Sequence, residues 1–381
     1  MRIHWIEFEN YTTGQKIEKI EFDRLNLLVG ESGAGKTQIL KTLSKYIDVV
    51  LYGKPIPFAG YFKMGFSVNQ VMDGNYEELN KTFVWKIKTN ESIINTNNSY
   101  SHGIVEEIVF KGNEKFITRD DKGLQIENQK APEISPDKSV LNIFKEPIDI
   151  SNIKANFFKT VSYFSQEKGL NPISLEVIRY VKKTLNNSSD NNMVGDFAKK
   201  LLFLPLNALI KVWIMKTYFK DTYFNFLNDL QAIFPVIEDV KVDFDNEINQ
   251  YKLFILQDGM WIPTEEISSG MLKTIYILCN SNFGIDESVI LLDELENGLG
   301  VNCLDEITDY ICEKSYDSNT QFILTSHHPY IINQIPENSW RIISQQNGII
   351  SSKRAIEVGI DTSKNRQDKF FQYINYIKRA S

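Results

Sequence analysis

The chain has 381 residues, enough for one large domain or two ordinary domains with ample cores. Its 42% hydrophobic and 24% charged residues are ordinary globular values and exclude wholesale disorder. The net charge of −7 excludes a generally basic surface, so any nucleic-acid contact has to be local. The three cysteines are odd in number and lack metal-ligand spacing, which predicts buried thiols in a reducing compartment.

The N-terminal residues 1–9 alternate polar and apolar side chains, which predicts a strand and not the continuous apolar core of a signal peptide. The most apolar segment, 201–215, includes Lys211 and is shorter than the roughly 20 residues that cross a bilayer. We therefore expect a buried helix there, no membrane contact and a cytoplasmic location.

Two strands are predicted at 2–9 and 17–29, and the second leads directly into a glycine-rich loop. Apolar residues at helical spacing predict a helix over 37–51. Short strand-like runs punctuated by glycine, proline and asparagine follow over 52–160 and indicate a β-rich region that returns at 161–166.

The second half of the chain begins with a helical pattern over 172–234 and continues with strands at 240–244 and 251–257. Two further strands, each ending in polar residues, follow before position 330. Alternating strands and helices of this kind predict an α/β fold.

The glycine-rich loop fits the phosphate-loop pattern of nucleotide-binding proteins. It comprises Gly30, Glu31, Ser32, Gly33, Ala34, Gly35, Lys36 and Thr37, followed by Gln38. Glycines let successive backbone N–H groups curl around phosphates, and the following helix directs the positive end of its dipole at them. We expect Lys36 to pair with the β- and γ-phosphates of ATP and Thr37 to bind Mg²⁺. Myosin motors share the loop pattern, but they are far longer and carry switch motifs that this sequence lacks.

A second motif is the apolar run Val289-Ile-Leu-Leu followed by Asp293 and Glu294. The run predicts a strand buried on both faces, and ligands of α/β sheets collect at the carboxyl ends of such strands. Asp293 is expected to orient Mg²⁺ or its water, and Glu294 to polarise the attacking water. In isolation, an acidic turn after a strand would be an equally simple interpretation.

Three further positions are candidates for the same site, one of them with two possible histidines. His327 follows the strand after this motif and could reach a γ-phosphate, with His328 as the other candidate for that position. Gln166 ends a strand-like run and could join Mg²⁺ and the attacking water. Tyr11, in the turn after the first strand, is a candidate to stack on the base, although aromatic residues are common in this chain.

The turn Ile267-Ser-Ser-Gly-Met271 lies between these motifs, upstream of the Asp293–Glu294 strand. In this order the motifs resemble the ABC-type ATPase heads of the SMC, RecF and OLD-like group, including the compact retron- and Septu-associated ATPases of bacterial phage defence. The resemblance covers 1–50 and about 160–345. It implies an α/β fold, namely an ABC-type P-loop NTPase head with a β-rich subdomain and a helical insertion.

The resemblance also implies a single head over residues 1–381. Its nucleotide-binding core comprises 1–51 and 236–350. A β-rich subdomain is expected over 52–165, a helical segment over 166–235 and a C-terminal tail over 351–381.

The resemblance implies a role for each residue that matches one of the family's motifs. Lys36 and Thr37 match the Walker A positions, Asp293 and Glu294 match Walker B, and His327 matches the switch histidine. The signature turn, which in this group contacts the γ-phosphate bound to the opposite protomer, is matched by Ser268, Ser269 and Gly270. The resemblance thus implies a homodimer that traps ATP head-to-tail. Its ATP hydrolysis would control a separate effector, such as a nuclease.

Two alternatives remain open. One is a DNA-binding ATPase of repair or replication, because basic residues outnumber acidic ones in the helical segment. These residues are Arg179, Lys182, Lys183, Lys199, Lys200, Lys211, Lys216 and Lys220. The other is the motor of an ABC transporter, which the divergent signature turn and the large β-rich region disfavour.

Overall fold

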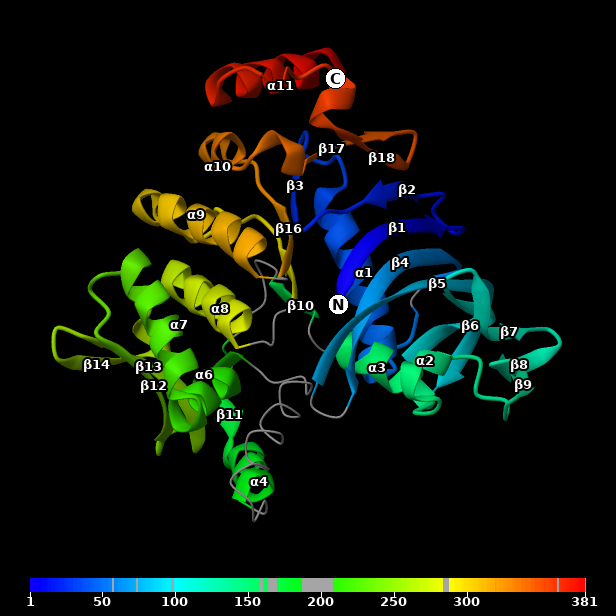
Figure 1. Cartoon of the computed structure of the whole chain (residues 1–381), viewed down its shortest axis with the longest axis horizontal. Helices are drawn as coiled ribbons and strands as arrows, with labels where there is room; N and C mark the ends of the chain where they lie inside the picture. The colour runs from blue at the N-terminus through cyan, green and yellow to red at the C-terminus, as the bar shows by residue number, and fades with distance from the viewer. Residues whose placement is uncertain are drawn as a thin grey trace. The chain divides into compact units, whose positions relative to one another are not determined.

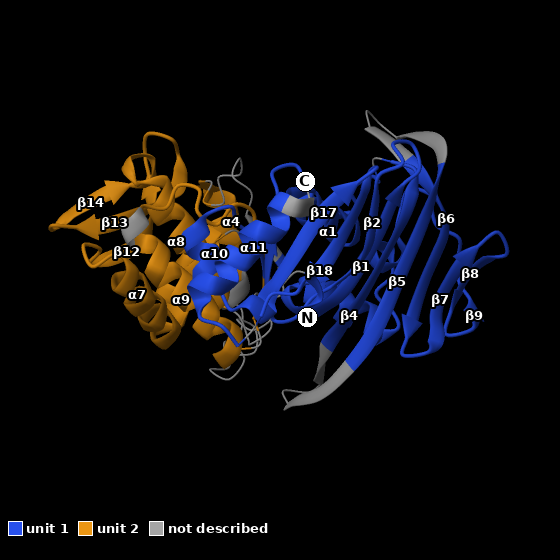
Figure 2. Cartoon of the chain, turned by 90° about the horizontal axis from the view of Figure 1, so that it is seen from above, with its two compact units in different colours: residues 1–160, 323–381 blue, residues 161–322 orange. Residues whose placement is uncertain are grey.

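The computed structural model describes residues 1–56, 58–72, 75–96, 99–157, 160–163, 170, 172–186, 208–283, 288–318, 320–361 and 363–380. Two compact units make up the chain. Unit 1 contains 1–160 and 323–381, and unit 2 contains 161–322 (Figure 2). Two strands, β10 (Thr160–Tyr163) and β16 (Gln321–Thr325), cross the boundaries between the units.

Unit 1 is built on a mixed sheet. Besides β16, its strands are β1 (Arg2–Asn10), β2 (Lys16–Glu21), β3 (Leu25–Val29), β4 (Gly60–Met72), β5 (Asn75–Thr96), β6 (Ser99–Lys111), β7 (Glu114–Asp120), β8 (Gly123–Ile126), β9 (Gln129–Lys130), β17 (Trp340–Gln346) and β18 (Ile349–Arg354). Their spatial order is β16-β3-β17-β18-β2-β1-β4-β5-β6-β7-β8-β9 (Figure 1). β3 and β17 are parallel, whereas β1 is antiparallel to both β2 and β4. The parallel pairing places the end of β3, where the glycine loop begins, beside β17.

The single strand predicted over 17–29 is wrong, because the chain turns between β2 and β3. The Asn26 side chain accepts a hydrogen bond from the backbone N–H of Asp23 at 2.7 Å and donates to the Asp23 carbonyl at 2.7 Å. Side chains of this kind compete with strand hydrogen bonds for backbone groups. The turn separates the antiparallel β1–β2 pair from the strand that carries the glycine loop.

Helices cover the sheet of unit 1. They are α1 (Lys36–Tyr52), α2 (Val140–Ile143), α3 (Ile148–Phe157), α10 (Pro329–Gln334) and α11 (Arg366–Ala380), with the 3₁₀ turns η2 (Glu337–Ser339) and η3 (Ala355–Val358). α1 confirms the helix predicted over 37–51. Its Tyr46 stacks on Phe62 of β4 with 3.8 Å between ring centroids, and the edges of Trp85 and Phe157 complete an aromatic core. This packing fixes α1, and with it the loop at its N-terminus, to the β-rich part of the unit.

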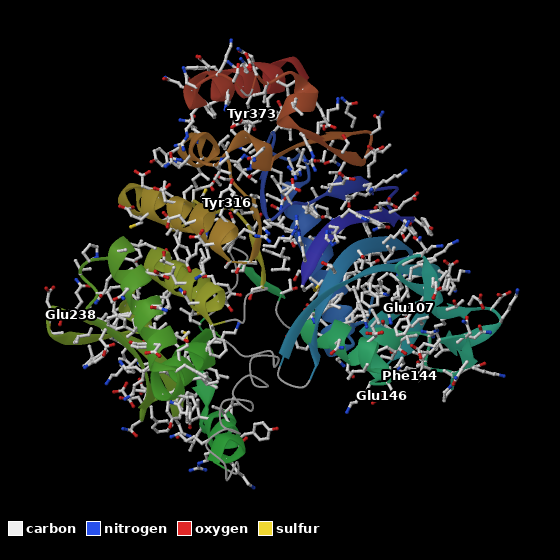
Figure 3. All side chains as sticks on the ribbon, viewed as in Figure 1. Glu107, Phe144, Glu146, Glu238, Tyr316 and Tyr373 are labelled. Atoms are coloured by element: carbon white, nitrogen blue, oxygen red, sulfur yellow. The ribbon has the colours of Figure 1, made fainter. Side chains whose placement is uncertain are left out.

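The β-rich prediction over 52–160 is confirmed for the described residues, with α2 and α3 as additions. Glu107 of β6, labelled in Figure 3, is fully buried and links β5 to the start of α2. Its carboxylate accepts hydrogen bonds from Trp85 Nε1 at 3.1 Å, from Ser139 Oγ at 2.5 Å and from the backbone N–H of Val140 at 2.9 Å. Burial raises the pKa of Glu107 despite these donors. The carboxylate holds the start of α2 against the sheet.

Unit 2 combines helices with a small antiparallel sheet. Its helices are α4 (Leu175–Asn186), α6 (Ala208–Tyr218), α7 (Lys220–Ile233), α8 (Ser269–Asn282) and α9 (Val301–Asp317), with the 3₁₀ turn η1 (Thr264–Glu266). The small sheet contains β11 (Ile173–Ser174), β12 (Asp239–Asp245), β13 (Gln250–Gln257) and β14 (Met260–Pro263). A further strand of unit 2, β15 (Val289–Leu292), is not part of the small sheet. β13 lies between β12 and β11 and also pairs with β14. The helical pattern and the strands predicted at 240–244 and 251–257 are therefore confirmed where the structure describes them.

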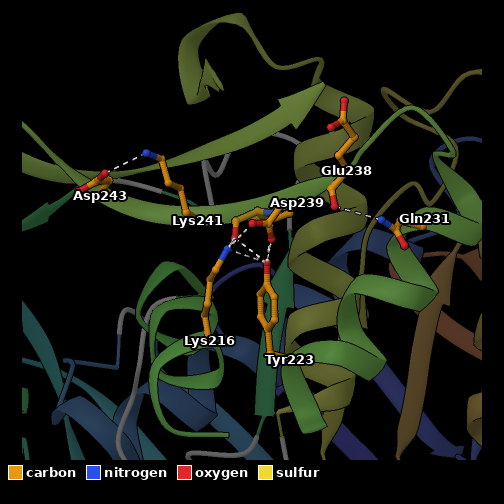
Figure 4. A network of polar contacts seen from close by, with 8 residues as sticks. Lys216, Tyr223, Gln231, Glu238, Asp239, Lys241 and Asp243 are labelled. Carbon is orange, nitrogen blue, oxygen red and sulfur yellow. Dashed lines mark hydrogen bonds and ion pairs between the residues drawn. The ribbon is translucent and has the colours of Figure 1, made fainter. Parts of the chain in front are cut away.

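A polar network joins the helices of unit 2 to the small sheet (Figure 4). Asp239 of β12 accepts from the ammonium of Lys216 at 2.6 Å and from the Tyr223 hydroxyl at 2.5 Å. The pKa of Asp239 is lowered: burial opposes the shift, and the bonds to Lys216 and Tyr223 outweigh it. Since Lys216 is held in this way, its charge stabilises the unit.

The apolar segment predicted as a buried helix corresponds in its described part to α6, whose residues 208–215 are all buried. No helix in the described ranges is long and apolar enough to cross a membrane. Of the three thiols, Cys279 is buried, whereas Cys303 and Cys312 are partly exposed. The expectation of buried thiols is thus correct for Cys279 only.

Candidate functional site

The glycine loop joins β3 to α1 within unit 1. All five residues of β3 are buried, as in a strand covered on both faces. Gly33 and Gly35 have φ values of +83° and +94°, a backbone region that favours glycine, and Gly35 is the N-cap of α1. The first turn of α1 contains no acidic side chain that would offset the positive end of its dipole. The loop is therefore a favourable place for an anion.

The space around these glycines fits a phosphate group. A Cβ atom at Gly33 would meet nothing within 4 Å, so the loop is open there. A Cβ atom at Gly35 would lie 2.4 Å from Cδ1 of Ile350, so this side of the loop is packed against β18. A turn of small residues with an open concave side lets backbone N–H groups approach a phosphate closely.

Lys36 lies inside this loop and is 4% exposed. Its ammonium donates to the carbonyl oxygens of Gly30 at 2.9 Å and Glu31 at 2.7 Å. The cation is thereby held where the loop curls, beside the backbone groups that would bind a phosphate. Thr37 and Gln38 follow in the first turn of α1 and are partly buried.

The C-terminal helix α11 contacts the start of the same loop. Tyr373 of α11, labelled in Figure 3, is 4% exposed. Burial together with the Glu31 carboxylate raises its pKa to about 12, against the opposing effect of the Gly30 backbone N–H. Gly30 also lies against β17, because a Cβ atom there would come within 2.3 Å of the Ile343 carbonyl oxygen. A cavity of about 230 Å³ lies between the loop, β17 and α11. It is lined by residues 31–34 and 342–346, Tyr376 and Ile377.

The two neighbouring histidines after β16 differ in their surroundings. His328 is the N-cap of α10, and its Nδ1 accepts from the backbone N–H of Tyr330 at 3.3 Å. His327 is exposed at the end of β16, the strand that lies beside β3 in the sheet. The capping bond gives His328 a structural role, so His327 stays the preferred candidate.

In unit 2, β15 ends directly before the two candidate carboxylates. All four residues of β15 are buried, and Asp293 is 5% exposed. Glu294 is partly exposed and has a φ of +49°, in the left-handed region that is uncommon for non-glycine residues. Asn297 contacts this residue twice, through its side-chain amide on Glu294 Oε2 and through its backbone N–H on the Glu294 carbonyl at 2.9 Å. The turn after β15 thus fixes an unusual backbone conformation at Glu294.

The signature turn forms the N-terminus of α8. Ser268 is the N-cap, and its Oγ accepts from the backbone N–H of Met271 at 3.2 Å. A hydroxyl that accepts one bond keeps its own proton to donate. Ser268 and Ser269 are exposed, and the first turn of α8 contains no acidic residue. The turn can therefore offer hydroxyl and backbone donors to an anion.

The signature turn packs directly on the turn that follows Glu294. A Cβ atom at Gly270 would lie 2.3 Å from the carbonyl oxygen of Gly298. A Cβ atom at Gly298 would in turn lie 2.8 Å from Ser269 Oγ. Glycine at position 270 is needed for this close backbone approach, and Gly298 has a φ of +80°, a region that favours glycine. Sequence reasoning predicted neither requirement.

Sequence reasoning also missed Lys273, one turn into α8. Its side chain is 1% exposed, and its ammonium donates to the carbonyl oxygens of Glu294, Leu295 and Asn297 at 2.7, 3.0 and 3.2 Å. Burial lowers the pKa of Lys273 to about 8, while nearby carboxylates, including those of Glu296 and Asp293, oppose the shift. The one feature of the sequence that could have indicated its buried role was a lysine inside an otherwise apolar helix.

The candidate residues thus form two groups, each within one unit. Unit 1 brings the loop Gly30–Thr37 and His327 to the ends of adjacent strands. Unit 2 brings the turn Ser268–Gly270 against the residues that follow Glu294. Gln166 lies outside the described residues. Tyr11 is 42% exposed in the turn after β1, in unit 1.

Comparison with solved structures identifies this arrangement of strands and helices. An SMC head bound to the C-terminal winged-helix domain of ScpA matches with a TM-score of 0.52 at 11% sequence identity, over 93% of this chain and 98% of that one. The fold is that of an SMC head. This confirms the predicted α/β fold of an ABC-type P-loop head. Other matches are an SMC head of Pyrococcus furiosus with an extended coiled coil, bound to the C-terminal domain of ScpA, and an SMC head of Thermotoga maritima. Their TM-scores are 0.46 and 0.39 at 13% and 12% identity, over 93% of this chain and 97% and 99% of theirs.

A comparison with protein-family models finds one match over part of the chain. Residues 165–333 match the family described as "AAA domain, putative AbiEii toxin, Type IV TA system". This segment contains the signature turn, Asp293, Glu294 and His327, and it is less than half of the chain. No curated protein matches the sequence.

Proposed function

We propose that this SMC-type head binds and hydrolyses ATP. The observation that carries the proposal is the glycine loop, which combines an open backbone turn, an uncompensated helix N-terminus and the buried ammonium of Lys36. These are the features that hold the phosphates of a nucleotide. Lys36 would pair with the β- and γ-phosphates.

The other candidate residues take the remaining roles in this proposal. Thr37 and Asp293 would hold Mg²⁺, with Gln166 as a further ligand, and Mg²⁺ would offset the charge of the phosphates. Glu294 would polarise the attacking water, because its carboxylate follows a buried strand and remains partly exposed. His327 would donate to the γ-phosphate.

We further propose that ATP joins two copies head-to-tail. Ser268, Ser269 and Gly270 would contact the γ-phosphate held by the partner copy. Exposed hydroxyls at the N-terminus of α8 support this role, because they can donate to an oxyanion while Ser268 still caps its helix. Hydrolysis would remove these contacts and release the pair.

The dimer would act as a switch for a separate effector in the cytoplasm, in bacterial phage defence. The description of the family that matches residues 165–333 names a "putative AbiEii toxin" of a toxin–antitoxin system, and such a system has two components. That description supports control of a partner more than the tethering of chromosomes. A nuclease is one class of effector that such a switch could control.

The test is Glu294→Gln, which keeps the shape of the side chain but removes its charge. We expect kcat for ATP hydrolysis to fall by about 100-fold or more, while ATP binding persists and ATP-bound dimers accumulate in light scattering. The matched control is Glu306→Gln on the exposed surface of α9, which should leave both properties unchanged. A Glu294→Gln protein with wild-type turnover would remove this role from Glu294, and a wild type without ATPase activity would refute the proposal.

A DNA-binding function is the second candidate, because α4 exposes Arg179, Lys182 and Lys183 beside Tyr180, which is 65% exposed. Among the described members of the predicted basic set, Lys211 is buried and the ammonium of Lys216 is paired with Asp239. Lys199 and Lys200 lie outside the described residues. Reversing the three exposed charges of α4 to glutamate tests this function. Loss of salt-sensitive duplex binding would support it, and the absence of binding by the wild type would exclude it.

A further inference from the structure

Lys273 occupies an unusual position for a cation. It lies in α8, the helix that begins at the signature turn, and its side chain is 1% exposed. An ammonium has three donors. The carbonyl oxygens of Glu294, Leu295 and Asn297 provide three acceptors, at 2.7, 3.0 and 3.2 Å. A buried lysine is thus matched to the backbone of one turn, the turn that contains the proposed catalytic glutamate.

That turn needs a cation at its centre. Three carbonyl dipoles point to one place, where they repel one another unless a donor lies between them. The turn is also bent at Glu294, whose φ of +49° is uncommon for a residue with a side chain. Conformations of this kind persist only where the surrounding structure holds them. The bond from the Asn297 N–H to the Glu294 carbonyl, at 2.9 Å, is a second restraint on the same bend.

We propose that Lys273 is a positioning residue for ATP hydrolysis, which holds the backbone of Glu294 so that its carboxylate is correctly directed. The inference rests on the proposed function, because Glu294 acts on water only if the protein is an ATPase. Lys273 touches neither the nucleotide nor the water in this scheme, and it acts through Glu294. Because Lys273 belongs to α8, it also links the turn to the signature helix.

The contact between Gly270 and Gly298 is an independent link between the same two segments. One link lies at the signature turn and the other lies one helical turn later. Together they allow α8 and the residues after β15 to move as one body. Loss of the ammonium should therefore leave the exposed hydroxyls of Ser268 and Ser269 in place for ATP-driven dimerisation and disturb the direction of Glu294.

The test compares Lys273→Met, which removes the charge at similar volume, with Lys273→Arg, which retains a cation. We expect Lys273→Met to lower kcat for ATP hydrolysis by at least 10-fold with less than a two-fold change in KM, and still to dimerise with ATP. Lys273→Arg should recover at least a third of wild-type kcat. The matched control is Lys211→Met, which removes a buried lysine of α6 in the same unit and should leave kcat unchanged.

Three outcomes would overturn the inference: a Lys273→Met protein with kcat within two-fold of wild type, a parallel rise in KM, or an arginine variant no more active than the methionine variant. If Lys273→Met does not fold, Lys273→Gln replaces it, because this variant removes the cation and keeps two of the three donors. Full kcat in Lys273→Gln would show that the turn needs no cation to direct Glu294, which overturns the inference. Failure of the proposed function is distinguishable, because the wild type would then show no ATP hydrolysis. A Glu294→Gln protein with wild-type turnover would instead remove the role of Glu294 on which the inference rests.

Discussion

Gly270 of the signature turn lies so close to Gly298 that a methyl group on Gly270 would be 2.3 Å from the Gly298 carbonyl oxygen. This distance is far below a van der Waals contact, and the atom in the way is backbone. Glycine at position 270 is therefore required by packing inside unit 2, in addition to any contact with a phosphate. The need for this glycine can be tested without nucleotide.

Gly270→Ala should destabilise the protein by about 1–3 kcal/mol, because the added methyl group forces two backbone segments apart. Urea denaturation measured without ATP gives the change in free energy of unfolding. The matched control is Gly300→Ala, since Gly300 has a φ of −68° and open space around the position of a Cβ atom. Gly300 is the N-cap of α9, so the control should cost no more than about 0.5–1 kcal/mol, from the poorer capping by alanine. Equal stability of the two variants would contradict the close packing.

Lys211 should destabilise the folded protein at neutral pH, because burial lowers its pKa from 10.5 to about 8. Between these values the unfolded chain binds more protons than the folded protein, so stability rises with pH across that window. Below pH 8 the folded protein bears the full cost of a buried cation, which its bond to Asn280 at 2.5 Å offsets in part.

Lys211→Met should therefore raise the free energy of unfolding at pH 7 by up to about 3 kcal/mol. The gain over wild type should shrink as pH rises from 8 to 10.5. Urea denaturation of both proteins at pH 7 and pH 10 measures the difference, in which the titration of the other lysines cancels. A gain that is the same at both pH values would show that the charge of Lys211 is not its cause.

The sequence predicted the parts of the fold that depend on local pattern. The runs that form β3 and β15 are apolar throughout, and both strands are fully buried. The glycine loop was placed correctly between a strand and a helix, because its pattern requires that context. Such features are encoded by neighbouring residues and need no knowledge of distant ones.

The sequence did not predict the features that depend on backbone groups distant in the chain. Nothing near Lys273 shows that its ammonium meets carbonyls after β15, since every residue has a carbonyl. The break before β3 depends on a reciprocal pair of bonds between Asp23 and Asn26, which overrides the strand preference of the flanking residues. Lys211 lies in the segment predicted as a buried helix and was also counted among the basic residues that could bind DNA, because charge alone does not reveal which side of a helix is covered.

Tyr373 should support the glycine loop from α11, although it lies far from it in the sequence. Its ring packs edge-on against Trp340 with 5.7 Å between centroids, and its hydroxyl faces the backbone N–H of Gly30. Tyr373→Ala should lower the free energy of unfolding by about 3 kcal/mol and weaken ATP binding. The measurements are urea denaturation and titration with a fluorescent ATP analogue.

Phe371→Ala is the control on the same helix, because Phe371 is 55% exposed. It should change stability by less than about 0.5 kcal/mol and leave ATP binding unchanged. Tyr373→Phe separates the hydroxyl from the ring, and it should retain most of the stability. A Tyr373→Ala protein that is destabilised but binds ATP normally would limit α11 to a structural role.

His327 and His328 should give opposite results when each is replaced by alanine. His328→Ala removes the acceptor for the Tyr330 N–H, so it should cost roughly 0.5–1 kcal/mol of stability and spare ATP turnover. His327→Ala should leave stability nearly unchanged, because the side chain is exposed, and lower kcat by about 100-fold if it donates to the γ-phosphate. Thermal unfolding and steady-state hydrolysis on the same two preparations decide the assignment. Loss of turnover in His328→Ala alone would transfer the phosphate-sensing role to His328.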